Sequence, residues 1–313
     1  GSFTWPADTI SVIPVSLAIS LISGLLFVFW ERRQEKALKN VILDLGLFSI
    51  TSFRNGSIAA AIISMGEFGI LFALPLWLQN VLLLTPIESG MVLLWLAGGA
   101  FLASGVTGGL NGKVSPKVLV QGGVALELVG AIGIALFANT EAGMWSIAPF
   151  LFVYGIGVGM ATAQLTGVIM VDVPMDKIGQ ASGSQSTVRQ VGSALGIAVL
   201  GTMLFTGVQS SLETRIADQV TDEVQSAKIV ELVVDSAGGV IPGLTDLLQS
   251  PATGAPLSPE VAKQITEDAG QAFTDGAKSS AWAAAAFLLL GLISTFNIGS
   301  AKAKTPAKTG AKE

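Results

Sequence analysis

Seven long segments of this chain carry almost no charged side chains, and they limit its fold more than any other feature. Each is at least 20 residues long, which is what a helix needs to cross a hydrocarbon core of about 30 Å. Two of the segments contain one internal acid, and the other five contain no charged residue. The segments are residues 10–30, 57–79, 90–110, 118–138, 145–171, 191–212 and 279–300. We therefore predict an all-α integral membrane protein with seven transmembrane helices.

Composition supports this prediction and excludes several functions. Only 12% of the residues are charged, about half the share found in a soluble protein. The chain contains no cysteine and no histidine, so it has no thiol nucleophile, histidine base or typical zinc site. The net charge of −5 argues against nucleic-acid binding. We predict no catalytic residues, no metal site, no cofactor and no enzymatic activity.

The basic residues indicate the orientation, because cytoplasmic loops are enriched in Lys and Arg. Most of them fall in alternate connections between the segments, and the other short connections contain none. Those in alternate connections are Arg32, Arg33, Lys36, Lys39, Arg54, Lys113, Lys117, Lys177, Arg189, Lys302, Lys304, Lys308 and Lys312. We predict a multi-pass protein of the cytoplasmic membrane with its N-terminus outside and its C-terminus in the cytoplasm.

The chain divides into four parts on this basis. Residues 1–208 hold the first six membrane helices, 209–278 form an extracytoplasmic helical loop, 279–300 form the last membrane helix, and 301–313 form a disordered cytoplasmic tail.

Within the loop, two apolar stripes with helical spacing predict a hairpin of helices. The first stripe is Leu212, Ile216, Val220 and Val224, and the second is Val261, Ile265, Ala269 and Phe273. Ser258, followed by proline, is the predicted N-cap of the second helix, and residues 238–257 are predicted as a loop. The alternative is a partly disordered acidic segment, since residues 213–278 contain eleven acids and four bases.

Two acids, Glu67 and Glu127, lie near the middle of predicted membrane helices. A charge at that depth costs on the order of 3 kcal/mol or more, so it needs a reason to be there. A buried carboxylic acid can exchange a proton, and both residues are candidates for proton coupling or substrate contact. Glu67 is the stronger candidate, because neighbouring glycines and Pro75 allow its helix to open beside it. The alternative is that each acid is protonated or hydrogen-bonded to a neighbouring helix and serves only packing.

Glycines in two of the helices permit two interpretations. Gly155, Gly157 and Gly159 superficially match a dinucleotide-binding loop, but no strand precedes them, so that interpretation fails. Gly192 and Gly196, with Gly201 beyond them, predict a face on which two helices approach closely.

The connection from 172 to 190 is dense in polar residues. It ends with Arg189 and Gln190 at the cytoplasmic end of a membrane helix. Arg189 either pairs with Asp172 or extends to the lipid headgroups.

Three stretches resemble one transporter family. Residues 181–196 (ASGSQSTVRQVGSALG) are similar to a signature of the fourteen-helix drug:proton antiporters of the major facilitator superfamily. Residues 30–33 with 43–48 resemble the loop before that family's ninth helix, and residues 109–117 resemble its cytoplasmic gating loop. The resemblance implies that Lys113, Asp172, Arg189 and Gln190 are candidates for cytoplasmic gating.

The resemblance also implies what the chain is part of. Its seven helices match helices eight to fourteen, so six of them would form the C-terminal bundle of a facilitator fold, built from two inverted three-helix repeats. The implied partners are a missing N-terminal half, the lipid bilayer, protons and a small lipophilic substrate.

Proton-coupled export of drugs or metabolites is therefore the first hypothesis for function. A non-transporting interaction protein, or an orphan half-transporter, is the second. A seven-helix receptor or light sensor is a weaker third, because residues 279–300 lack the lysine that a retinal would need.

Overall fold

The computed structural model describes residues 12–36, 41, 43–110, 113–141, 144–251 and 255–298. In this part of the chain, seven helices are long and apolar enough to cross a membrane, and the all-α prediction is confirmed. The predicted tail at 301–313 lies outside the described residues.

The elements are α1 (Val12–Lys36), η1 (Leu45–Ser49), α2 (Thr51–Asn80), α3 (Pro86–Gly109), α4 (Pro116–Phe137), η2 (Met144–Ser146), α5 (Ala148–Ile169), η3 (Met175–Lys177), α6 (Ile178–Ile216), α7 (Glu223–Asp235), η4 (Ile241–Gly243), α8 (Leu244–Leu248) and α9 (Pro259–Phe296).

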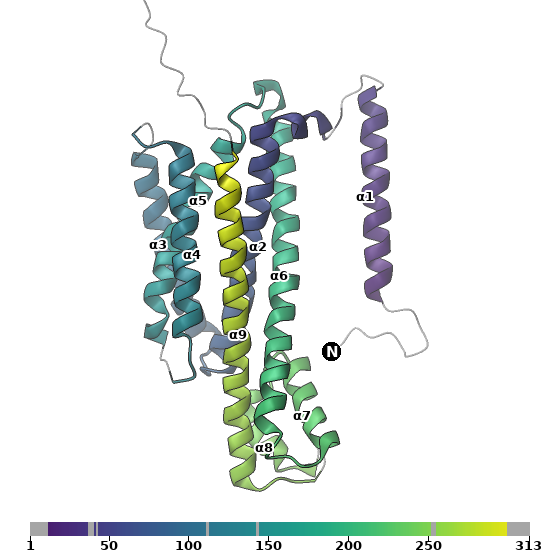
Figure 1. The fold of residues 1–313 in the computed structure, drawn as a ribbon, viewed down its shortest axis with the longest axis vertical. Coiled ribbons are helices and arrows are strands. Elements are labelled where there is room, and N and C mark those ends of the chain that lie inside the picture. Colours follow the sequence, from purple (N-terminus) through teal and green to yellow (C-terminus); the bar gives the residue numbers. More distant parts are fainter. Residues whose placement is uncertain are drawn as a thin grey trace, which may run out of the picture.

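Six of the long helices pack into one bundle, and α1 stands apart from it (Figure 1). Only 6% of the α1 span is buried, against 61% of α2. The side chains of α1 are apolar along most of its length, so this helix is suited to contact with lipid on nearly all sides.

The bundle consists of two three-helix repeats that exchange their first helices. In chain order the repeats are α2–α3–α4 and α5–α6–α9. Nevertheless α2 packs against α6 and α9, whereas α5 packs against α3 and α4. Contacts between α4 and α9 join the two groups. The first helix of each set of three thus packs against the other set.

Helix α6 corrects the predicted boundary of the sixth membrane helix. The polar stretch before residue 191 is not a loop: η3 and the first turns of α6 occupy it, and α6 continues to Ile216. Its hydroxyl groups bond back to the carbonyl one turn earlier, as Ser184 does to Gln180 and Thr187 to Gly183. Polar side chains satisfied in this way are compatible with a helix, so polarity alone placed the boundary wrongly.

The segment between the last two membrane helices is folded and helical. Helices α6 and α9 extend past the other helices, and α7 and α8 pack between their ends, opposite to η1 (Figure 1). The predicted loop at 238–257 is therefore partly wrong, because it contains η4 and α8. One helix, α9, spans the predicted boundary at residue 278, so the second helix of the loop and the last membrane helix are continuous.

The predicted helix start and the second apolar stripe agree with the structure. The Ser258 hydroxyl accepts a hydrogen bond from the Val261 backbone N–H at 3.4 Å, and Ile265, Ala269 and Phe273 are fully buried. The first predicted stripe is confirmed as buried only from Leu212 to Val220. Val224 is 77% exposed, because α6 ends at Ile216 and Val224 begins a new helix with a different face.

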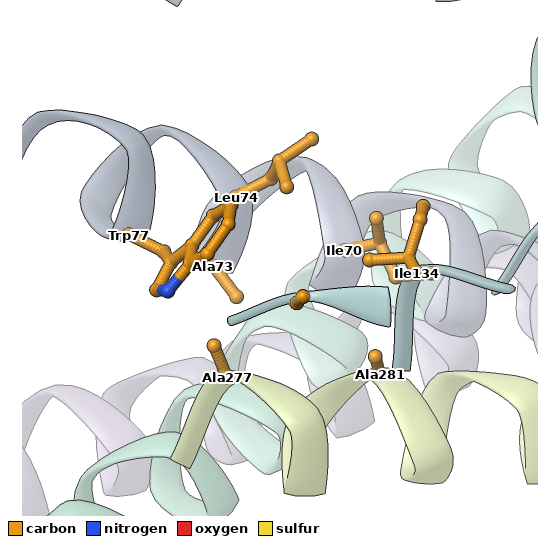
Figure 2. A pocket seen from close by; sticks show the side chains of 8 residues that line it. Ile70, Ala73, Leu74, Trp77, Ile134, Ala277 and Ala281 are labelled. Atoms are coloured by element: carbon orange, nitrogen blue, oxygen red, sulfur yellow. The ribbon is translucent and has the colours of Figure 1, made fainter. Parts of the chain in front are cut away.

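A small cavity lies where α2, α4 and α9 meet (Figure 2). Its volume of about 20 Å³ leaves room for about one water molecule. Side chains from α2, among them Trp77, face Ile134 of α4 and two alanines of α9 across it. The Trp77 indole N–H donates to the Thr274 hydroxyl at 2.9 Å. Because the lining is apolar and the space is small, this is a packing gap rather than a ligand site.

Candidate functional site

An ion pair inside the bundle connects α2 and α6. The Glu67 carboxylate on α2 lies 3.6 Å from the guanidinium of Arg189 on α6. Glu67 is buried, and the Arg189 Nε donates to the Ser64 hydroxyl at 3.3 Å. The two predicted environments for Arg189, a pair with Asp172 or the lipid headgroups, therefore differ from the one observed.

Two glycines of α6 allow the two helices to approach closely enough for this pairing. Gly192 and Gly196 lie against the α2 backbone at Ala61 and Met65, where an added methyl group would overlap backbone atoms. Gly201 instead faces the ring of Phe72, which would lie 3.2 Å from such a methyl group. The first two glycines thus set the close approach of the helices that carry Glu67 and Arg189.

Glu127 on α4 is fully buried and faces α5. A methyl group at Gly157 of α5 would lie 2.7 Å from the Glu127 Cγ, so the two helices touch at this level. Within the part of the chain that the structure describes, neither carboxyl oxygen of Glu127 has a hydrogen-bond partner. A carboxylate without donors in such a place is far more costly than a neutral acid. The geometry therefore suits a protonated Glu127.

The three side chains form one electrostatic cluster. Glu127 lies within electrostatic reach of both Glu67 and Arg189, so one partly exposed cation lies near two buried acids. The pair Glu67–Arg189 balances its own charge, and Glu127 is the acid left over. The sequence predicted each residue separately, but their assembly depends on how four helices pack, which no local pattern records.

A polar cleft adjoins the cluster along α6. It has a volume of about 350 Å³ and is open on one side. Arg189 and Gln190 line it, so Gln190 lies beside the ion pair rather than at a loop. The remaining lining residues are Phe68, Thr166, Ser182, Gln185, Ser186 and Ser193. Sequence reasoning noted this polar stretch only as a connection, and missed that it is one face of a membrane-level helix.

The other two gating candidates lie outside the cluster. Lys113 is exposed in the turn between α3 and α4, and Asp172 is exposed just beyond α5. Different residues connect elements at this end of the bundle. Lys177 pairs with Asp44 at 2.5 Å, and the Lys117 ammonium donates to the Phe296 carbonyl at 2.9 Å, at the end of α9.

The glycines at 155, 157 and 159 serve packing in this structure. Gly155 and Gly159 lie against the backbone of α3, and Gly157 lies against α4. Helix α5 can therefore sit close to two neighbours at once. The described residues contain no group of three or more acids that could hold a metal ion.

Comparison with known proteins places this geometry in a family. The model of the family described as Major Facilitator Superfamily matches residues 4–197. The chain is 29% identical to Multidrug resistance protein Stp of Mycobacterium tuberculosis, over 73% of this chain and 42% of the relative. It is 29% identical to Multidrug efflux pump LfrA of Mycolicibacterium smegmatis, over 88% of this chain and 50% of the relative. The chain is also 28% identical to Drug efflux pump JefA of Mycobacterium tuberculosis, over 70% of this chain and 43% of the relative. The chain thus spans half or less of the length of these relatives.

Proposed function

Because this chain belongs to the Major Facilitator Superfamily, we propose that it forms the C-terminal part of a proton-coupled exporter of drugs or small lipophilic compounds. Three relatives are named as multidrug resistance or efflux proteins, and the superfamily consists of transporters rather than enzymes. The bundle of α2 to α9 would be one half of the transporter, and α1 an additional membrane helix beside it.

One observation carries this proposal: the buried ion pair Glu67–Arg189 lies beside an unpartnered acid, Glu127, next to a polar cleft. Charged groups inside a membrane protein are costly and mark ion or substrate routes. A cluster of two acids and one base can hold or release one proton while its total charge stays within one unit of neutrality.

The geometry favours different roles for the two acids. Glu67 would be the fixed counter-ion of Arg189, and Glu127 would carry the exchangeable proton. This reverses the sequence-based ranking, which placed Glu67 first because of its neighbouring glycines and Pro75. Pro75 lies two turns beyond Glu67 within the continuous helix α2, whereas Arg189 directly contacts its carboxylate.

The open polar face of α6 supports a second bundle as the partner. Ser182, Ser186 and Gln190 are exposed there at the level of the membrane helices. Polar side chains at this depth are seldom left facing lipid. We propose that the N-terminal bundle covers this face and that the substrate binds between the bundles, with Phe68 supplying apolar contact.

The orientation of the chain is part of the proposal. Arg54 lies in the first turn of α2, directly after η1, Lys177 pairs with Asp44 at the N-cap of η1, and Lys117 contacts the C-terminal end of α9. The positive-inside rule assigns the end of the bundle that carries η1 to the cytoplasm. Helices α7 and α8 then lie outside the cell, and the protein resides in the cytoplasmic membrane.

A non-transporting interaction protein is the second candidate function. The observation in its favour is the well-packed external part, in which Leu244, Leu248, Ile265 and Phe273 are fully buried. A folded part of this kind could hold a partner whether or not the bundle transports.

The export hypothesis is tested with Glu127→Gln in the complete transporter, reconstituted with an imposed proton gradient. We expect uphill dye export to fall to background while equilibrium dye binding is retained, because glutamine keeps the shape but exchanges no proton. Glu141→Gln is the matched control, since Glu141 is exposed beyond α4, and it should export at the parental rate. Glu67→Gln should weaken binding or folding instead, because it leaves Arg189 without its counter-ion. Parental export by Glu127→Gln would refute the assignment.

A further inference from the structure

Tyr154, the only tyrosine in the chain, is placed in an unusual way. It is fully buried on α5, and its hydroxyl has no hydrogen-bond partner in the described structure. Buried tyrosine hydroxyls usually find a partner. Unsatisfied polar groups in a native interior call for an explanation, and a functional role is one of them.

The packing of α4 against α5 brings Tyr154 and Glu127 close together. Gly157 of α5 lies at the level of Glu127, and Gly130 of α4 lies at the level of Tyr154. A methyl group at Gly130 would lie 2.6 Å from the Tyr154 Cβ. Each polar residue thus sits opposite a glycine of the other helix. Three residues, or about 4.5 Å of helical rise, separate the two levels.

The phenol also lies near the second acid. Burial acts most strongly on the Tyr154 hydroxyl, followed by the charges of Glu127 and Glu67. Helix α9, which also packs against α4, contributes no charged residue between 279 and 296. Among the described residues, the titratable groups near Glu127 on neighbouring helices are Tyr154 of α5, Glu67 of α2 and Arg189 of α6.

These observations suggest what the hydroxyl does. Glu127 with its proton is neutral and can remain without a donor. Once that proton leaves, the carboxylate needs a hydrogen bond, because an ion without one is costly in an apolar interior. Arg189 is already engaged with Glu67 and Ser64. Tyr154 carries a buried O–H that has no partner in the described structure, and its position on α5 is three residues of helical rise from the level of Glu127.

We propose that Tyr154 is a positioning residue whose hydroxyl donates a hydrogen bond to Glu127 after Glu127 has released its proton. The proton of Glu127 leaves toward the cleft, and Tyr154 keeps its own proton throughout. No other bond forms or breaks. This inference rests on the proposed role of Glu127 in proton coupling, but its first test does not depend on transport.

The single tyrosine permits a direct measurement on this chain. Tyrosine labelled with ¹³C at Cζ gives one NMR signal when the chain is reconstituted in lipid nanodiscs. We expect this signal to shift as the pH rises, with the same midpoint as the loss of the Glu127 carboxylic-acid C=O band in the infrared. In Glu127→Gln both changes should vanish, and in the control Glu141→Gln both should remain. A tyrosine signal that does not change with pH, or that still shifts in Glu127→Gln, would overturn the proposal.

A second measurement uses Tyr154→Phe, which removes only the hydroxyl. The loss of the acid C=O band should move to higher pH, because the ionised form has lost its donor. In the complete transporter the pH profile of export should move in the same direction. Tyr154→Phe should add nothing in the Glu127→Gln background, as a double-mutant cycle would show. An unchanged midpoint of the C=O band in Tyr154→Phe would also overturn the proposal.

The two proposals can fail separately. If Glu127 and Tyr154 titrate together but the complete transporter exports no dye, the proposed function is refuted and this inference stands.

Discussion

At the scale of single residues, ion pairs connect helices that lie far apart in the sequence. Arg189 reaches across from α6 to Glu67, and Arg215 contacts Asp275 at 2.9 Å where α6 and α9 extend past the bundle. Glu127 differs from these pairs, because it is fully buried and neither of its carboxyl oxygens has a hydrogen-bond partner among the described residues. This difference is the reason to assign it a proton rather than a partner.

The ion pair between Asp44 and Lys177 gives a pH-dependent prediction. The Lys177 ammonium, with help from the Gly46 backbone N–H, holds the pKa of Asp44 below its ordinary value of 3.8. An acid whose pKa is lowered in the folded protein stabilises the fold at pH values above its ordinary pKa. This contribution is lost as the pH falls through the lowered pKa. Asp44→Asn should cost about 0.5–1 kcal/mol at neutral pH, because Lys177 is partly exposed, and should keep the N-cap of η1.

Thermal unfolding in detergent between pH 7 and pH 3 measures this effect. The difference in thermal stability between the parent and Asp44→Asn should shrink only at the acid end of this pH range. A constant difference across the whole range would show that the mutation acts through packing rather than charge.

The residue scale also shows what sequence alone could and could not provide. Glu67 and Glu127 were identifiable because charged residues inside apolar segments are rare and conspicuous, and Arg189 was identifiable because it ends a polar stretch that resembles a family signature. Tyr154 was not, because one tyrosine in a membrane helix is ordinary until its hydroxyl is known to be buried and unpartnered. The pairing of Arg189 with Glu67 joins positions 122 residues apart, and no local pattern encodes such a contact.

At the scale of elements, glycines decide which helices touch. Gly192 and Gly196 bring α6 against α2, and Gly155 and Gly159 bring α5 against α3. Without a hydrophobic driving force between helices in lipid, such close packing is a main source of association. The glycine pattern predicted close contact from sequence, but not which helix would be the partner.

Gly192→Ala tests this role. The added methyl group would overlap the α2 backbone at Ala61, so α2 and α6 must separate, at a cost of about 1–3 kcal/mol. Gly183→Ala is the matched control on the same helix, because an added methyl group there meets nothing within 4 Å. It should be neutral or slightly stabilising, since alanine favours a helix. Thermal unfolding of both variants in detergent measures the difference. Equal effects would mean that α2 and α6 do not depend on this close approach.

Helix ends were the least predictable property of the elements. The caps at Ser258 and Pro259 follow local chemistry and were predicted. The ends of α6 and α9 were not, because both helices continue past the rest of the bundle, where α7 and α8 bury their inner faces. Hydropathy records where a helix leaves the apolar environment, and that is a different position from where the helix ends.

At the scale of the whole molecule, the central result is a six-helix bundle of exchanged repeats with one polar, open face. Apolar segment length predicted the helices, and the Lys and Arg distribution predicted the orientation. The packing of the repeats followed only from resemblance to a family, because it depends on contacts between distant segments.

The orientation is tested with two single cysteines in a chain that naturally contains none. Cysteine in place of Ser250, near α8, should react with an impermeant maleimide from outside intact cells. Cysteine in place of Ser115, at the start of α4, should react only after the cells are opened. Both residues lie in connections rather than inside membrane spans, and Ser115 is exposed while Ser250 is half-buried. The opposite labelling pattern would reverse the proposed topology.

The most direct test of the account is proton-driven dye efflux from proteoliposomes. These contain either this chain alone or this chain joined to the N-terminal bundle that we propose as its partner. Alternating access needs two bundles around one site, so the account predicts no efflux from the chain alone. The joined protein should show efflux that requires both the gradient and Glu127. Gradient-driven efflux by the chain alone, or by the joined Glu127→Gln variant at the parental rate, would contradict it.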